Sequence, residues 1–408
     1  MMKKQFGYCF WASLCCLLAL SCKKYTPQSD IGGAAYLRVF NEIPFNLDLS
    51  NKAQVVPFFT MLVDPVIGGD GTPTGGKIVG DYLGSRQFFN TSTSSNEGNA
   101  LGTSLDTTVR YNINYEYPGN AHVLTAPSIN GLDLSAWAQV TSGKHRFIFI
   151  ARPQNYIDFP ALSDTIRRKI IIDTTIDLQE GQVYTMEAVL QDVDATKYGV
   201  YLRQENFTTQ TLDANKNYVS FYNLSGKNSV FSNLNISPSS NYFYDTMNVS
   251  YTYNTVTIPP DPTILPVVNA LPGYNNLALT TLTGRMPASA PYYPLPVLPV
   301  SYFYDNQGNL RTYDQFGSNG TGTMPYFVFT FLASGNNIPG TGMLQQYSFF
   351  CDFDPVTVND VSAFHLGDHN ANLNMLVQSD GQIYLYPAIY IMELVFDHIY
   401  LMQVQRKL

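Results

Sequence analysis

The chain has 408 residues, of which 45% are apolar and only 13% are charged, and its formal net charge is −8. This composition excludes an intrinsically disordered chain, because enough apolar surface is present to build a sizeable core. The acidic balance, without a basic face in the sequence, also predicts no nucleic-acid partner.

The first residues have the pattern of an export signal. Lys3 and Lys4 precede an uncharged, mostly apolar run over 6–20. In a helix this run spans ~22 Å, too short for the ~30 Å hydrocarbon core of a bilayer. We therefore predict a secretory signal peptide over 1–21.

The end of this signal, Leu18-Ala-Leu-Ser-Cys22, resembles a lipobox, the site at which bacterial lipoprotein signals are cut before a cysteine. The resemblance implies an acylated Cys22 that attaches the protein to a membrane. It predicts a cell-envelope, outer-membrane lipoprotein, with the periplasmic or surface face left open. An ordinary secretory signal with a chance cysteine is the alternative. Cys351 would be the other thiol of the mature chain, and its apolar surroundings predict a buried, inert side chain.

After a polar tether over 22–33, the pattern of the first half favours strands. The first strand, 35–41, has Leu37 and Val39 on one face and Tyr36, Arg38 and Phe40 on the other, with the period of two of a sheet. Residues 64–108 are predicted to be mostly loop. Further strands are expected at 109–117, 144–151, 169–173, 182–190 and 199–204.

A second copy of the first strand begins near residue 216. Tyr218-Val-Ser-Phe-Tyr-Asn223 matches Tyr36-Leu-Arg-Val-Phe-Asn41 in aromatic, aliphatic and amide positions. The separation is far longer than the about 20–50 residues of a solenoid repeat, so a domain duplication is predicted. A proline-rich insert at 258–300 is expected to be a connector or edge segment. Strands follow at 326–332 and 344–350, and the apolar stretch 382–404 is expected to form two or three more.

Together these elements predict an all-β protein with tandem antiparallel β-sandwich (immunoglobulin-like) domains. We place the first domain at 34–215 and the second, more divergent, at 216–408.

Three motifs in the first half carry a family resemblance: Tyr36-Leu-Arg-Val-Phe-Asn, Ser142-Gly-Lys-His-Arg-Phe and Gly181-Gln-Val-Tyr-Thr. They resemble the domain of unknown function 4397 family of Bacteroidota-type envelope lipoproteins. The resemblance covers 34–205, with a divergent second copy from 216. It implies a β-sandwich in the envelope and brings no catalytic residue with it.

A cluster of carboxylates and imidazoles is the candidate metal site. His365 and His369 are four residues apart, but Gly367 between them favours a loop over the helix that usually places such a pair on one face. Solvated loop residues are the simpler interpretation. The candidate ligands are Asp352, Asp354, Asp360, His365, Asp368 and His369.

Closely spaced tyrosines in Asn-rich and Pro-rich surroundings are the candidate ligand-stacking residues. Exposed rings beside amides can stack on sugars, whereas packing between strands is the simpler explanation. The candidates are Tyr242, Tyr244, Tyr251, Tyr253, Tyr292 and Tyr293.

The sequence has no Gly-x-Ser-x-Gly elbow and no dinucleotide-binding fingerprint, so we predict neither a catalytic residue nor a cofactor. The leading hypothesis is a non-catalytic envelope protein that binds a glycan or an outer-membrane protein. One alternative is a pilin-like subunit that assembles by strand exchange through 382–404. A metal-dependent or glycoside hydrolase is the other.

Overall fold

The computed structural model describes residues 31–43, 57–84, 116–117, 128–129, 131–134, 136–155, 157–193, 195–214, 216–227, 246–257, 267–295, 323–333, 343–350, 370–372, 376–379, 382–385, 388–396 and 398–405. Over these residues the chain is almost entirely β-structure. The helical elements described are α2 (Asp164–Arg167) and the 3-10 turns η3 (Phe159–Ala161) and η4 (Asn206–Thr208). The predicted all-β fold is confirmed.

Two sheets come from the first half of the chain. Sheet I has the order β3-β2-β8-β9, built from β2 (Phe58–Ile67), β3 (Pro73–Gly84), β8 (Gly143–Ala151) and β9 (Ile170–Leu178). Sheet II has the order β11-β10-β1-β4, with β7 also paired to β1. Its strands are β1 (Ala34–Asn41), β4 (Glu116–Tyr117), β7 (Ala138–Thr141), β10 (Val183–Asp192) and β11 (Lys197–Gln204).

Two further sheets come from the second half. Sheet III has the order β16-β12-β22-β23, from β12 (Asn217–Asn223), β16 (Tyr293–Leu295), β22 (Ala388–Val395) and β23 (His398–Gln405). Sheet IV has the order β14-β13-β17-β18-β19, with β15 also on β13. Its strands are β13 (Thr246–Thr257), β14 (Val267–Ala270), β15 (Leu277–Thr283), β17 (Thr323–Ala333), β18 (Met343–Phe350) and β19 (Asn370–Asn372).

Two small ribbons complete the described strands. They pair β5 (Ser128–Ile129) with β6 (Leu132–Asp133), and β20 (Leu376–Ser379) with β21 (Gln382–Leu385).

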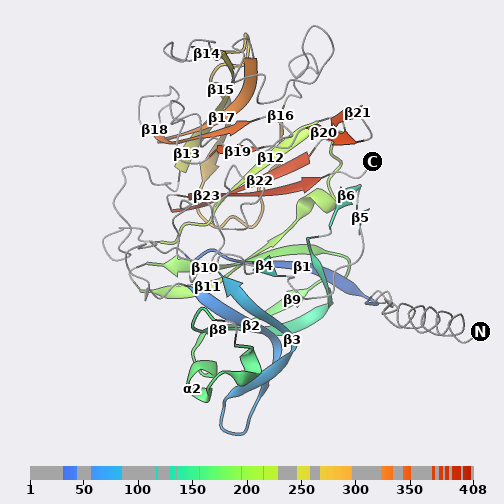
Figure 1. The fold of residues 1–408 in the computed structure, drawn as a ribbon, viewed down its shortest axis with the longest axis vertical. Coiled ribbons are helices and arrows are strands. Elements are labelled where there is room, and N and C mark those ends of the chain that lie inside the picture. Colours follow the sequence, from blue (N-terminus) through green and yellow to red (C-terminus); the bar gives the residue numbers. More distant parts are fainter. Residues whose placement is uncertain are drawn as a thin grey trace, which may run out of the picture.

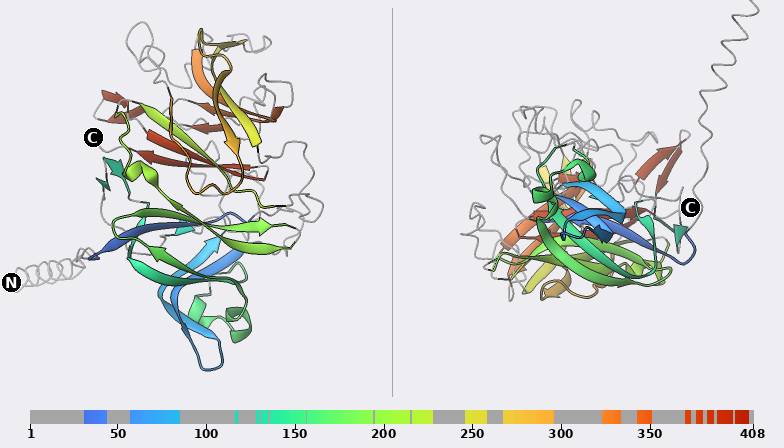
Figure 2. Two further views of the ribbon diagram at one scale, coloured as in Figure 1. Left: turned by 180° about the vertical axis from the view of Figure 1, so that it is seen from behind. Right: turned by 90° about the horizontal axis from the view of Figure 1, so that it is seen from below.

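The four sheets stack in the order I, II, III, IV (Figures 1 and 2). One core lies between sheets I and II and contains Leu37, Val39 and Met186. A second core lies between sheets II and III, where Phe40 and Tyr222 are buried. Phe221 of sheet III packs edge-on against Phe329 of sheet IV, with ring centroids 5.7 Å apart. The molecule is therefore two sandwiches, I with II and III with IV, whose inner sheets II and III also pack on each other.

The alternation predicted for the first strand is confirmed. Leu37 and Val39 belong to the core between sheets I and II, whereas Phe40 faces the core between sheets II and III and Tyr36 packs against it. Because sheet II is covered on both faces, its central strand β10 is buried over its first eight residues. A strand buried on both faces reads as a nearly continuous apolar run rather than an alternating one.

The expectation for the proline-rich insert 258–300 is confirmed over its described residues, because β14 and β15 each pair with β13 alone and β16 with β12 alone, as edge strands do. Two other expectations need correction. Residues 64–84, the part of 64–108 that the structure describes, are not mostly loop, because β2 and β3 form a hairpin there, with the turn at 68–71. The sandwiches are not wholly antiparallel either, since β1 pairs in parallel with β10, and β12 with β22. Glycine and lysine obscured the hairpin pattern, and a parallel pairing leaves no local sequence signal because its strands are far apart in the chain.

The same pairing scheme occurs in both halves. In sheet II, Tyr36 of β1 pairs with Val183 of β10, and in sheet III, Tyr218 of β12 pairs with Ile389 of β22. Each of these parallel partners then pairs with the antiparallel strand that follows it, β11 or β23. The register aligns VYTMEAV at 183–189 with IYIMELV at 389–395, and VYLRQ at 200–204 with IYLMQ at 399–403. This recurrence supports the duplication, while the domain limits at 215 and 216 stay a prediction.

Backbone hydrogen bonds next to Gly226 join the segment after β12 to the end of β10. The Lys227 amide donates to the Gln191 carbonyl at 2.8 Å, and the Val193 amide donates to the Lys227 carbonyl at 3.1 Å. A Cβ atom at Gly226 would collide with the backbone carbonyl of Leu190. Only a residue without a side chain fits this crossing between the two halves.

We therefore expect Gly226→Ala to lower the free energy of unfolding by about 1–3 kcal/mol, the usual cost of overpacking. Urea-induced unfolding measures this change. Gly75→Ala is the matched control, because a Cβ there meets no atom within 4 Å. Equal stability of the two variants would contradict the close approach.

Candidate functional site

The densest group of ionisable side chains in the described residues lies between sheets II and III. Arg203 is at its centre, and its guanidinium contacts three carboxylates. Nη1 lies 3.1 Å from Oε1 of Glu187, Nε lies 3.0 Å from Oε1 of Glu205, and Nη2 lies 2.5 Å from Oε1 of Glu393. All four side chains have a relative exposure of 0%. We call Arg203, Glu187, Glu205 and Glu393 the inter-sheet charge cluster.

Strand register brings this cluster together. Arg203 on β11 pairs with Thr185 on β10, which places it diagonally across from Glu187, two residues further along β10. Glu205 directly follows β11, and its Oε1 accepts a hydrogen bond from the Thr185 hydroxyl. Glu393 comes from β22 of the facing sheet. The cluster thus joins residues of sheet II to a residue of sheet III.

Aromatic rings enclose the cluster. The guanidinium of Arg203 lies 4.5 Å from the ring centroid of Tyr222. The hydroxyl of Tyr201 donates to the Pro287 carbonyl at 2.5 Å, and the Tyr222 hydroxyl accepts from the Ala290 amide at 3.2 Å. Burial raises the pKa of Tyr222 to about 12, so this hydroxyl stays neutral under physiological conditions. The segment before β16 therefore covers the cluster from one side.

The two halves contribute unequally to the cluster. Glu187 pairs with Phe40 and Glu393 pairs with Tyr222, so the duplication makes these two glutamates equivalent. Arg203 pairs with Thr185, whereas the equivalent residue of the second half, Met402, pairs with Ile391. One arginine from the first half thus serves both equivalent glutamates.

Burial is the largest influence on the pKa values of Glu187, Glu205 and Arg203. Desolvation raises the pKa of Glu187 well above its usual range; the charge of Arg203 opposes this and the neighbouring glutamates add to it. Desolvation likewise raises the pKa of Glu205, against Arg203 and the Thr185 hydrogen bond. Burial alone would lower the pKa of Arg203, but the three carboxylates raise it well above its ordinary value. Arg203 is therefore charged, and the carboxyl groups compete for one counter-charge.

This geometry does not suit catalysis on a substrate. A general acid or base must come within hydrogen-bonding distance of the reacting group. The four side chains of the cluster have no exposed surface. Its chemistry is that of an ion-pair network that joins two sheets.

A second polar cluster fixes a surface segment on sheet I. Arg152 donates to Oδ1 of Asn155 at 2.8 Å and also to Asp81 and the Ile157 carbonyl. Asp81 accepts from the amide of Phe159 at 2.7 Å. Phe159 is thereby held over the outer face of sheet I, where it packs with Leu62, Ile148, Ile150 and Leu162. This cluster too stabilises the fold.

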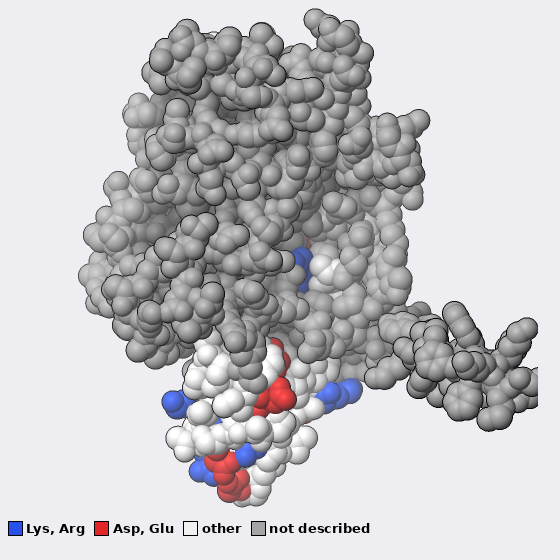
Figure 3. Space-filling model, viewed as in Figure 1, with Lys and Arg blue, Asp and Glu red and all other residues white. Residues whose placement is uncertain are grey.

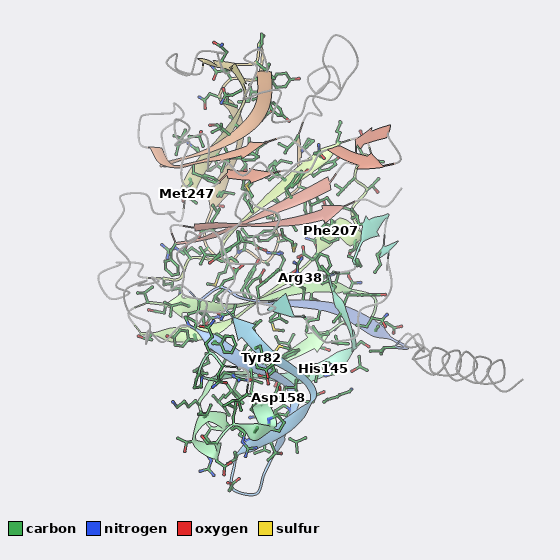
Figure 4. All side chains as sticks on the ribbon, in the orientation of Figure 1. Arg38, Tyr82, His145, Asp158, Phe207 and Met247 are labelled. Atoms are coloured by element: carbon green, nitrogen blue, oxygen red, sulfur yellow. The ribbon has the colours of Figure 1, made fainter. Side chains whose placement is uncertain are left out.

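Tyr82 and His145 also have structural partners in this sandwich (Figure 4). The hydroxyl of Tyr82 donates to Asp158, and burial together with that hydrogen bond raises the pKa of Tyr82 to about 12. His145 Nδ1 lies 2.7 Å from Oδ2 of Asp64, and its Nε2 lies 2.7 Å from the Thr141 carbonyl oxygen. Since both ring nitrogens already face acceptors, neither is placed to act on a substrate.

The tyrosines predicted to stack on ligands are packed where they are described. Tyr253 is fully buried and Tyr251 is 9% exposed, and their rings meet edge-on at 6.1 Å on β13. Tyr292 is also 9% exposed, and the Tyr293 hydroxyl lies 2.5 Å from Oγ1 of Thr280. Tyr251 and Tyr253 therefore share a buried face, as the simpler explanation of packing between strands predicts, since period-two spacing fixes a shared face but not the side that meets solvent.

The remaining predicted site residues lie outside the described residues. These are Cys22, the tyrosines Tyr242 and Tyr244, and the metal candidates Asp352, Asp354, Asp360, His365, Asp368 and His369. Within the described ranges, no three His, Cys, Asp or Glu side chains converge as metal ligands would. Those ranges also contain no helix of the length and apolarity needed to span a bilayer.

Charged side chains on the described surface are mixed in sign. Figure 3 shows basic and acidic groups side by side on the lower sandwich. Two of the pairs are Arg146 with Asp173 and Arg168 with Asp70. Comparison with protein-family models, curated proteins and solved structures found no match. The resemblance to the domain of unknown function 4397 family therefore stays a prediction from the three motifs.

The inter-sheet charge cluster was not predicted from the sequence. A signal for half of it was present, since Tyr-x-Met-Glu occurs at both 184–187 and 390–393. A glutamate inside an apolar strand, repeated in both halves, indicates a buried partner for each copy. The position of Arg203 between the two glutamates depends on contacts across 190 residues of chain, which no local pattern encodes.

Arg203→Met tests the cluster with the residue found at the equivalent position of the second half. Removing one partner of a buried ion pair leaves uncompensated charge, so we expect a loss of about 3–5 kcal/mol in the free energy of unfolding. Arg146→Met is the matched control, since it breaks an exposed pair with Asp173 and should cost about 0–1 kcal/mol. Chemical denaturation of both variants measures the difference, and a loss for Arg203→Met as small as the control's would contradict the structural role.

Proposed function

We propose that the protein is a lipid-anchored component of the bacterial cell envelope with a non-catalytic structural or binding role. The observation that carries this proposal is the position of the folded body relative to Cys22. The first strand begins at Ala34, shortly after the lipobox-like Leu-Ala-Leu-Ser-Cys22 sequence. The lipid would thus tether a rigid stack of sheets close to the membrane.

The use of charge inside the body supports the non-catalytic part of the proposal. Both polar clusters of the described residues join pieces of the fold: Arg203 joins sheets II and III, and Arg152 fixes the segment over sheet I. Function would then depend on the outer surface rather than on a reactive cleft.

Labelling with a palmitate analogue and membrane fractionation test the anchor. We expect the wild-type chain to be labelled and to fractionate with the envelope membranes, and Cys22→Ser to lose both properties. Cys351→Ser is the matched control, because it removes the other thiol predicted to remain after cleavage. Labelling of Cys22→Ser at the wild-type level would contradict the proposal.

The partner is better sought among proteins than glycans. Of the candidate stacking tyrosines, Tyr251, Tyr253 and Tyr292 are buried, whereas five large aliphatic side chains of the described residues are exposed, all in sheet I or the segment over it. They are Val66, Ile67, Val79, Ile157 and Ile170. Exposed aliphatic groups suit contact with another protein more than contact with sugar hydroxyls.

Val79→Asp with Ile157→Asp tests this surface. Both side chains are largely exposed, at 41% and 47%, so the double variant should keep its thermal stability while co-purification of an envelope protein is lost. Quantitative mass spectrometry of crosslinked membranes compares it with the wild type, and Lys197→Asp on β11 is the control. An unchanged partner set, or glycan-array binding by the double variant, would contradict a protein partner on sheet I.

A further inference from the structure

The space between sheets II and III contains more acid than base. Glu42, directly after β1, is 1% exposed and lies close enough to Glu187 to raise the pKa of its carboxyl group, as Glu205 and Glu393 also do. Arg38 of β1 also lies on this face, over the rings of Phe40 and Trp137, at 4.5 and 5.4 Å. All four carboxyl groups are buried, so they cannot all ionise without a large desolvation cost.

Hydrogen bonding shows which carboxyl group is least supported as an anion. Glu393 accepts from Nη2 of Arg203 at 2.5 Å, and Glu205 accepts from Nε at 3.0 Å and from the Thr185 hydroxyl. Glu187 is near Nη1 of Arg203, at 3.1 Å, but neither of its oxygens nor this nitrogen makes a hydrogen bond with the described residues. Hydrogen bonds donated to a carboxylate favour its ionised form, and Glu187 accepts none from the described residues.

Most of the charged groups near Glu187 therefore favour the neutral form of its carboxyl group. Arg203 on β11 is the cation that opposes protonation, while Glu42 after β1, Glu205 after β11 and Glu393 on β22 favour it. Tyr201 and Tyr222 are the neutral phenols nearby, and Tyr292, before β16, faces Glu205.

We propose that Glu187 holds a proton while sheets II and III are packed together, and that loss of this proton at alkaline pH loosens the contact between the two sandwiches. The inter-sheet charge cluster then acts as a proton-dependent lock. This inference concerns the folded body and does not depend on the lipid anchor or on a partner.

The sign of the pH dependence follows from the raised pKa of Glu187 in the folded state. Its ordinary value is 4.5, so its protonation favours the folded state increasingly weakly as pH rises above that value. The stabilising contribution is fully present below 4.5 and is lost as pH rises through the folded-state pKa. An ordinary surface carboxylate such as Asp173, whose pKa is lowered by its hydrogen bond to Arg146, gives the opposite trend.

The test is thermal unfolding of the full chain from about pH 5 to about pH 9, with Glu187→Gln as the variant that mimics the neutral acid. Trp137 reports on this interface, because it is buried in the core between sheets II and III and contacts Phe207. With Trp11→Phe as background, Trp137 is the chain's remaining tryptophan. We expect the Tm of the wild type to fall with rising pH, and the fall to be reduced by about half or more in Glu187→Gln.

Two controls make the result specific. Asp173→Asn should keep the wild-type decrease at alkaline pH. Glu393→Gln should lower Tm at every pH. This substitution removes a charge-assisted hydrogen bond to Arg203, whereas Glu187→Gln replaces a protonated carboxyl group. A Glu187→Gln profile parallel to the wild type would overturn the proposal. If Glu187→Gln does not fold, the infrared band of a buried protonated carboxyl group in the wild type at neutral pH decides: its presence supports the lock and its absence overturns it.

Discussion

The contact between the two inner sheets depends on one guanidinium. Arg203 reaches three carboxylates that come from β10, from the residue after β11 and from β22, and none of these side chains meets solvent. Apolar packing alone would allow two twisted sheets to rotate or slide, since dispersion and hydrophobic contacts have little direction. Hydrogen bonds to a planar guanidinium are directional, so they fix how sheet II lies on sheet III. The core between sheets I and II is built from apolar side chains such as Leu37, Val39 and Met186.

The duplication explains why such a cluster arises at this interface. When two copies of a sheet face each other, equivalent residues can come close together, and here Glu187 and Glu393 both contact Arg203. Two buried glutamates repel unless a cation lies between them. A homodimer would have to bury two arginines to supply that cation symmetrically. Within a single chain one copy can carry Arg203 while the other has Met402, so one cation serves both glutamates.

The sequence predicts those strands whose own residue pattern shows which of their faces are buried. The strand at 35–41 alternates because one face meets each core, and the stretch 382–404 divides into β21, β22 and β23 near Pro387 and Asp397, as expected. The hairpin of β2 and β3 was missed because its strands continue through Gly75, Gly76 and Lys77, which read locally as a turn. The exposure of Tyr251 and the partners of Glu187 were beyond prediction because both depend on which sheet lies opposite. That information is in the packing between strands far apart in the chain.

The central position of β22 bears on assembly by strand exchange. In sheet III, β22 pairs with β12 on one edge and with β23 on the other, and it supplies Glu393 to the cluster. If β22 left its own sheet to complete a neighbour's, Arg203 would lose its 2.5 Å contact with Glu393, and the core around Ile389 and Ile391 would open. The cost would be that of breaking a buried ion pair together with the exposure of apolar surface. Within the described part of 382–404, strand addition to sheet III without this loss would use the outer edge of β23, a terminal strand of that sheet. Assembly through that edge would leave the inter-sheet charge cluster closed and the two sandwiches joined.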